Sequence, residues 1–344
     1  MKGRLITLDH INGLEAAAYL VDGKLDDLLI DQPDAPRPGA IYRAICDRPI
    51  KGQGGMMLRL PDGETAFLRA GKGLRPGQPL LVQVTGYAEG GKAVPVTDRI
   101  LFKSRYAIVT PGKPGVNISR QIDDDDRRDE LMGIARAVFE SDHGLILRSS
   151  CAAGNDEEIA DDIVAMLDLA DAVMADAGGT TPEALTDGDG PHTLAWREWT
   201  GAAQVITEPG SFENYGVLDQ MAALANPLVP LGEGTMYVEA TRALVAVDIN
   251  TGNDTSPAAA LKANLAAARA LPRALRLRGL AGQVCVDFVS ISKAHRKQVE
   301  QSLRAAFKND AIETSLVGWT QMGLFELQRK RERAAFPRDL LKDI

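Results

Sequence analysis

Two short apolar segments, LVAVDIN at residues 244–250 and VCVDF at residues 284–288, decide the fold of this 344-residue chain. Each is rich in β-branched or small apolar residues, which favours a strand, and each carries an aspartate near its carboxyl end. Between them, Ser256 and Pro257 provide an N-cap and a first-turn proline, and the Ala/Leu-rich run that follows has helical spacing. The order strand, helix, strand predicts a right-handed crossover with two parallel neighbouring strands.

Such a crossover would bring Asp248 and Asp287 side by side at the end of the sheet where α/β proteins usually carry out their chemistry. Two carboxylates held close in a partly dry cleft repel each other, and a divalent cation relieves this repulsion. Mg²⁺ fits best, because it prefers oxygen ligands and often rests on one or two carboxylates. The alternative is that the two aspartates merely end their strands.

The net charge of −8 conceals a segregated distribution. Residues 121–190 contain 19 acidic and 4 basic side chains, whereas residues 41–105 contain 5 acidic and 11 basic ones. Residues 273–308 are also basic, with 8 basic and 2 acidic side chains. The two basic regions could therefore bind a polyanion despite the acidic average.

Four segments of the chain stand out for their motifs and spacing: VDINTG at 247–252, LRLRGLAG at 275–282, VDF at 286–288 and MGLFELQRKR at 322–331. Together they resemble the catalytic core of the bacterial ribonuclease E/G endoribonucleases, in which similar motifs follow at the same spacing. The resemblance is strongest over residues 230–333 and is collinear over most of the rest.

The resemblance implies a mixed α/β fold of several subdomains. Residues 1–36 with about 180–222 would form a ribonuclease H-like scaffold, and residues 37–99 an inserted OB-fold barrel of the ribosomal S-one type. Residues 100–179 would form a 5′-sensor segment, and residues 223–344 a DNase I-like catalytic subdomain. The residues themselves predict a hairpin at Asp22-Gly23, short strands broken by Gly and Pro between 40 and 99, and a turn-rich linker at 178–192.

In the catalytic subdomain, the resemblance implies that Asp248 and Asp287 hold one Mg²⁺. Asn250 would orient the Asp248 carboxylate or the scissile phosphate. Arg276 and Arg278 would contact RNA phosphates. Cys285 alternates with valines and is expected to pack as a small hydrophobic residue.

In the barrel, the resemblance implies that Phe67 stacks on an RNA base and that Lys92 makes a basic contact; the alternative for Phe67 is a place in the barrel core. Met57 stands where the family has a second aromatic residue, and Gln321 where it has an arginine.

The 5′-sensor segment has three candidate residues, Arg120, Arg148 and Ser149, which match the family residues that bind a 5′ monophosphate. A guanidinium and a hydroxyl at a strand end can together hold a terminal phosphate.

The expected function is a Mg²⁺-dependent endoribonuclease that cuts single-stranded RNA, either mRNA or precursors of rRNA and tRNA. It would leave a 5′ phosphate and a 3′ hydroxyl, with stimulation by a 5′-monophosphate end. The alternatives are an RNA-binding or ribosome-maturation factor with little cleavage activity, and a phosphodiesterase acting on something other than RNA.

Cofactor, partner and location expectations follow from the same residues. Three scattered cysteines and the lack of a Cys-Pro-x-Cys motif before Ile344 predict no zinc and no zinc-linked dimer, leaving the oligomeric state open. Without a signal sequence or an apolar run long enough for a bilayer, a cytoplasmic protein with no membrane partner is expected.

Overall fold

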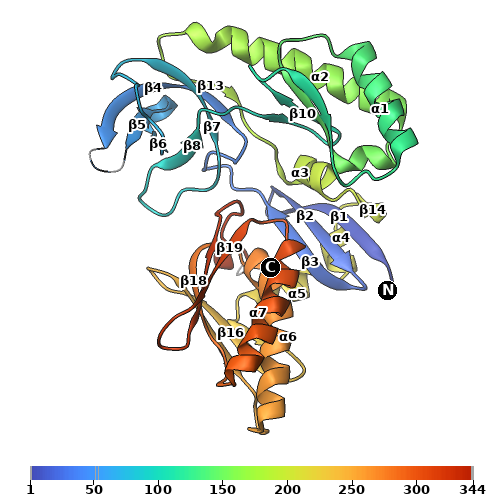
Figure 1. Ribbon diagram of the computed structural model, residues 1–344, viewed down its shortest axis with the longest axis vertical. Coiled ribbons are helices and arrows are strands. Elements are labelled where there is room, and N and C mark those ends of the chain that lie inside the picture. Colours follow the sequence, from blue (N-terminus) through green and yellow to red (C-terminus); the bar gives the residue numbers. More distant parts are fainter. Residues whose placement is uncertain (1, 51, 53, 342–344) are drawn as a thin grey trace. The chain divides into compact units, whose positions relative to one another are not determined.

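The computed structural model describes residues 2–50, 52 and 54–341, and the chain divides into two compact units (Figure 1). The first unit consists of Met1–Gln32 with Ala203–Ile344, and the second is Pro33–Ala202. In the described part of the chain, no helix combines the length and the apolar character needed to cross a bilayer.

A four-stranded sheet in the first unit has the order β14-β1-β2-β3. Its strands are β1 (Arg4–Ile11), β2 (Leu14–Val21), β3 (Lys24–Ile30) and β14 (Gln204–Ile206). The Asp22-Gly23 hairpin is confirmed, since both residues have positive φ, 50° and 78°, as the turns that join two-residue hairpins require. Two short helices follow β14, namely α4 (Ser211–Asn214) and α5 (Val217–Leu224).

The second sheet of this unit has six strands in the order β15-β16-β17-β18-β20-β19. They are β15 (Leu228–Pro230), β16 (Thr235–Ala240), β17 (Val245–Asn250), β18 (Gly282–Asp287), β19 (Thr314–Trp319) and β20 (Phe325–Arg329). Helix α6 (Pro257–Leu277) joins β17 to β18, and α7 (Lys293–Lys308) follows β18. The Ser256 hydroxyl accepts the Ala259 N–H, so the predicted N-cap is confirmed.

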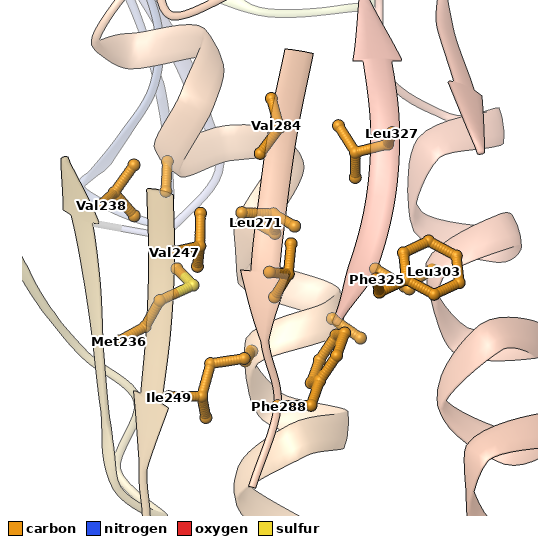
Figure 2. Packing of buried hydrophobic residues seen from close by; sticks show 14 of the residues in the cluster. Met236, Val238, Val247, Ile249, Leu271, Val284, Phe288, Leu303, Phe325 and Leu327 are labelled. Carbon is orange, nitrogen blue, oxygen red and sulfur yellow. The ribbon is translucent and has the colours of Figure 1, made fainter. Parts of the chain in front are cut away.

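One face of the six-stranded sheet packs on α6 and α7 (Figure 2). Val247 and Ile249 of β17 and Val284 and Val286 of β18 point into this core, where they meet Leu271 of α6. Because strand side chains alternate between faces, the residues between them point to the opposite face. Asp248, Asn250 and Asp287 are all exposed there.

A closed five-stranded barrel forms part of the second unit, consistent with the expected OB-like architecture. Its strands are β4 (Ile41–Ile50), β5 (Gly55–Arg59), β6 (Thr65–Leu68), β7 (Pro79–Val84) and β8 (Val94–Thr97). Pairing of β4 with both β5 and β7 closes the barrel.

The linker expected at residues 178–192 is not structureless. Strand β13 (Glu183–Thr186) pairs antiparallel with β4, so this stretch extends the barrel sheet instead of joining the N-terminal strands. The buried Arg43 explains the attachment, because its guanidinium donates to the Thr181 carbonyl at 3.1 Å and forms ion pairs with Asp176 and Glu183.

The rest of the second unit is a sheet of order β11-β12-β10-β9 with helices on it. The strands are β9 (Phe102–Lys103), β10 (Ala107–Thr110), β11 (Gly115–Ile118) and β12 (Gly144–Leu147). The helices are α1 (Asp125–Val138), α2 (Asp156–Ala175) and α3 (Pro191–Glu198). Short 3-10 turns lie at Pro61–Gly63, Ser149–Ala152, Asp176–Gly178 and Arg338–Leu341.

Candidate active site

The two aspartates of the first unit are direct neighbours across parallel strands. In the register of β17 with β18, Val247 lies opposite Val286 and Asp248 lies opposite Asp287. Both carboxylates are exposed on the face away from α6 and α7, not in the partly dry cleft that we expected. The alternation of the strands is the reason: the β-branched residues take the helix-covered face and leave the aspartates to solvent.

Asn250 lies two residues after Asp248 on the same face of β17. Its amide Nδ2 donates to Asp248 Oδ2 at 2.7 Å. This bond constrains the orientation of the Asp248 carboxylate, and the catalytic role of Asn250 stays a prediction. Tyr237 of β16 lies opposite Asp248 in the antiparallel register and is 38 % exposed, so its ring borders the same site.

The donor set fits Mg²⁺ better than zinc. Among the described residues, no group of three or more His, Cys, Asp and Glu side chains could together hold a metal ion. A structural zinc site needs four such ligands, whereas Mg²⁺ commonly rests on one or two carboxylates and takes its remaining ligands from water or phosphate. Asp248 and Asp287 are the two carboxylates that would hold such an ion.

Cys285, predicted to pack as a small hydrophobic residue, is only half-buried. Its neighbours Val284 and Val286 are buried on the helix side, and Cys285 is half-buried on the face that carries Asp287. Partial burial, together with Glu326 and Asp287, raises the pKa of the thiol. Cys285 is therefore a neutral neighbour of the two-aspartate site at pH 7.

Phe67 lies on the outer surface of the barrel. Ala66 and Leu68 fill the core, whereas Phe67 is half-buried and faces the other way. Its ring covers Gly55, where a Cβ would come within 2.4 Å of the ring, and Met57 lies opposite Phe67 in the β5–β6 pairing. Phe67 and Met57 thus form an outward-facing apolar pair, the arrangement that base stacking needs.

Lys92 is also on the surface of the barrel. Its ammonium pairs with Glu89, three residues earlier, and 69 % of its side chain is exposed. An exposed pair of this kind contributes little, about 0–1 kcal/mol, so it would yield to a phosphate at small cost.

The parallel pairing of β11 with β12 makes the backbone segment of Arg120 a neighbour of the segment that carries Arg148 and Ser149. Ile118 lies opposite Leu147, and the Ser119 N–H donates to the Leu147 carbonyl at 2.8 Å, so the residues that follow both strands meet at one edge. Arg120 and Ser149 are exposed.

The guanidinium of Arg148 is held by a carboxylate that the sequence analysis missed. Arg148 Nη2 lies 2.7 Å from Glu198 Oε2, and Lys103 and Arg197 contact Glu198 Oε1 at 3.0 and 2.7 Å. Burial alone would raise the pKa of Glu198, but Lys103, Arg148 and Arg197 lower it to about 2. Glu198 is 50 residues from Arg148, and no local pattern of residues predicts their contact.

Arg276 is not on an RNA-accessible surface, contrary to expectation. Its side chain is 9 % exposed and forms ion pairs with Asp26 at 3.0 Å, with Asp27 at 3.5 Å and with Asp310. Burial would lower the pKa of Arg276, but the three carboxylates raise it. The last turn of α6 packs against β3, so Arg276 is part of a buried ionic cluster.

Arg278 is likewise buried, with 7 % of the residue exposed. Its guanidinium donates to the Asn226 carbonyl at 2.9 Å and to the Ala274 carbonyl at 3.3 Å. The expected phosphate contact is not supported for either arginine, because both side chains are buried and their guanidinium groups bind protein atoms.

The chain is similar in sequence to known proteins over most of its length. The sequence profile of the Ribonuclease E/G family matches residues 102–205 and 197–332. The chain is 26% identical to Ribonuclease G of Salmonella typhimurium and 25% identical to Ribonuclease G of Escherichia coli K12, over 92% of this chain and 77% of each relative. It is 27% identical to Ribonuclease E of Nostoc sp., over 75% of this chain and 44% of that relative.

Proposed function

This chain belongs to the ribonuclease E/G family, and from that premise we propose that it is a Mg²⁺-dependent endoribonuclease acting on single-stranded RNA. The observation that carries the proposal is the register of β17 with β18, which sets Asp248 beside Asp287 on an exposed face. The relatives named Ribonuclease G and Ribonuclease E support the ribonuclease assignment.

The residues of the site have separate tasks in this proposal. Asp248 and Asp287 would hold one Mg²⁺, and Asn250 holds the Asp248 carboxylate in place for it. The ion would supply Lewis acidity to a phosphoryl oxygen and make a coordinated water more acidic. Cleavage would leave a 5′ phosphate and a 3′ hydroxyl, as the resemblance implies.

Binding of the RNA strand is assigned to the second unit. The outward-facing Phe67 with Met57 would stack on bases, and Lys92 would contact a phosphate. The substrates would be mRNA or precursors of rRNA and tRNA in the cytoplasm. By the same resemblance, we assign the sheet β14-β1-β2-β3 to a ribonuclease H-like scaffold and the six-stranded sheet to a DNase I-like subdomain.

Stimulation by a 5′ monophosphate would require displacement of Glu198. The Glu198 carboxylate occupies the Arg148 guanidinium with a 2.7 Å contact, so a terminal phosphate competes with an internal anion. We therefore expect a small preference of the native protein for 5′-monophosphate RNA over 5′-hydroxyl RNA. Glu198→Gln should increase the preference, and Arg148→Ala should abolish it, as measured by kcat/KM on matched oligonucleotides.

Cleavage of a fluorescent single-stranded RNA oligonucleotide tests the main proposal. The native protein should cut it with Mg²⁺ and not with EDTA, and Asp287→Asn should lower kcat by at least about 100-fold. Glu326→Gln is the matched control, because Glu326 is an exposed acid of the neighbouring strand β20 that lies opposite Cys285 rather than Asp287.

The same assay separates the enzyme from the second candidate function. Tight RNA binding by the native protein without cleavage, unchanged in Asp287→Asn, would replace the enzyme with an RNA-binding factor of the same fold. Met57 in place of an aromatic residue is the observation that favours this second candidate.

A further inference from the structure

A tight turn borders the edge of the sheet where the two aspartates lie. The antiparallel pairing of β18 with β20 places Val286 opposite Phe325, so the turn at residues 320–323, which precedes β20, is next to the end of β18. The Gly323 N–H donates to the Thr320 carbonyl at 3.1 Å and closes the turn. Gln321 is exposed in it, and Met322 is 89 % exposed.

Arg296 reaches this turn from α7. The helix begins at Lys293, six residues after Asp287, with the Ser292 hydroxyl accepting the His295 N–H, and Arg296 lies in its first turn. A Cβ on Gly323 would lie 3.2 Å from the Nη2 of Arg296, so the guanidinium is against the turn. Gly323 also has a φ of +90°, and a side chain there would be both strained and crowded.

An aromatic ring fixes the position of this guanidinium. The Arg296 Cζ is 4.7 Å from the centroid of the Trp319 ring. Trp319 in turn packs on Phe288 and Phe325, with ring centroids 5.5 and 5.3 Å apart. Stacking holds the plane of a guanidinium and leaves its N–H edge able to bind a planar or tetrahedral anion.

Arg296 differs from three other arginines of its unit in its charge partners. Arg276, Arg329 and Arg333 each pair with an aspartate. In the portion of the chain that the structure describes, Arg296 has its aromatic contact and no carboxylate. The first turn of α7 contains no acidic residue, and Lys293 and Lys297 are exposed nearby on the same helix.

We propose that Arg296 contacts a backbone phosphate of the RNA strand that lies at the Asp248 and Asp287 site. It would supply, from α7, the positive charge that the family resemblance places at position 321, where this chain has Gln321. The inference rests on the proposed ribonuclease function and names a substrate contact within it. A phosphate at this edge would be neutralised by the metal on one side and by the guanidinium on the other.

Kinetics of three variants test this contact. Arg296→Gln should lower kcat/KM for a single-stranded RNA about tenfold or more, the loss of one charge-assisted hydrogen bond. It should also reduce the slope of log kcat/KM against log salt by about 0.7, the value for one phosphate contact on a single strand. Lys297→Gln, which removes an exposed charge from the next position, should change kcat/KM less than about twofold. Adding Gln321→Arg to Arg296→Gln should restore most of the loss, because it returns a guanidinium to the same turn.

The outcomes that overturn the inference are distinct from those that overturn the proposed function. If the native protein cuts RNA and Asp287→Asn does not, the proposed function stands independently of Arg296. If Arg296→Gln and Lys297→Gln then had the same kcat/KM and the same dependence of kcat/KM on salt, the phosphate contact would be refuted. Arg296→Gln could also lower the activity together with the unfolding temperature, leave the salt slope unchanged and not be rescued by Gln321→Arg. That result would refute the phosphate contact as well, and would mean that Arg296 only stabilises the packing of Trp319.

Discussion

At the scale of the residue, a hydrogen bond from Asn250 Nδ2 to Asp248 Oδ2 constrains the orientation of the Asp248 carboxylate. A group that orients a metal ligand without binding the metal typically contributes a factor of about 10 to 100 in metal affinity or activity. The exposed position of Asp248 makes this constraint important, because packing does not hold its rotamer.

Asn250→Ala should therefore raise the Mg²⁺ concentration needed for half-maximal cleavage by about tenfold or more, with a smaller change in RNA affinity. Titration of the cleavage rate with Mg²⁺ measures this. Gln283→Ala, an exposed residue of β18 at the opposite end from Asp287, serves as the control. Equal Mg²⁺ dependence of the two variants would mean that Asn250 does not orient the ligand.

The contribution of Glu198 to the stability of the fold should depend on pH. Its pKa in the folded protein is about 2, below the ordinary value of 4.5, so its ion pairs stabilise the fold above pH about 5 and lose this contribution as the pH falls towards 2. At pH 7, Glu198→Gln should lower the free energy of unfolding by up to about 3 kcal/mol.

At pH 3 the difference between Glu198→Gln and the native protein should shrink to about 1.4 kcal/mol, because Glu198 is then largely protonated in the unfolded state and the pH is close to its pKa of about 2 in the folded protein. Urea denaturation at both pH values measures it. A difference that is the same at pH 7 and pH 3 would contradict the ionic role of Glu198.

At the scale of the element, sequence patterns predicted the pairing of strands correctly where a single crossover joins the two strands. The β17-α6-β18 unit carries its own N-cap, its strand residues and both aspartates, so its register followed from the pattern. Strand β13 and the Arg148–Glu198 contact join segments about 50 to 140 residues apart, and a single sequence holds no periodicity for such pairs. Arg276 and Arg278 were predicted wrongly for a related reason: a basic helix end looks solvent-exposed until its partners in the protein are known, which are carboxylates for Arg276 and backbone carbonyls for Arg278.

The buried ionic cluster at the end of α6 provides the test at this scale. The side chain of Asp310 is fully buried and pairs with both Arg276 and Arg329. Asp310→Asn would leave two buried guanidinium groups short of a counter-charge and should destabilise the first unit by about 3 kcal/mol or more.

Thermal or urea unfolding of the first unit would measure the loss for Asp310→Asn. Glu313→Gln, which breaks the exposed pair with Lys330, is the control and should cost less than about 1 kcal/mol. If the two variants had equal stability, the cluster would not hold α6 and β3 together.

At the scale of the whole molecule, the proposed tasks fall in different units. The carboxylates for the metal lie in the unit built from Met1–Gln32 and Ala203–Ile344, and the barrel with Phe67 lies in Pro33–Ala202. Variants of the two units should therefore affect different kinetic constants. Phe67→Ala should weaken binding of single-stranded RNA by about 1–3 kcal/mol and raise KM, with kcat little changed, as measured by fluorescence anisotropy and initial rates. A fall in kcat without a change in RNA affinity would contradict this division.

We propose that a metal ion on Asp248 and Asp287 acts at the scissile phosphate of an RNA strand. The most direct test of this proposal is cleavage of an RNA with one non-bridging oxygen of the mapped cleavage site replaced by sulfur. Because Mg²⁺ binds sulfur poorly and softer metals bind it well, cleavage should fall at least about tenfold in Mg²⁺ and recover in Mn²⁺ or Cd²⁺. Equal rates of the sulfur and oxygen substrates in every metal, or full activity of Asp287→Asn, would contradict the account.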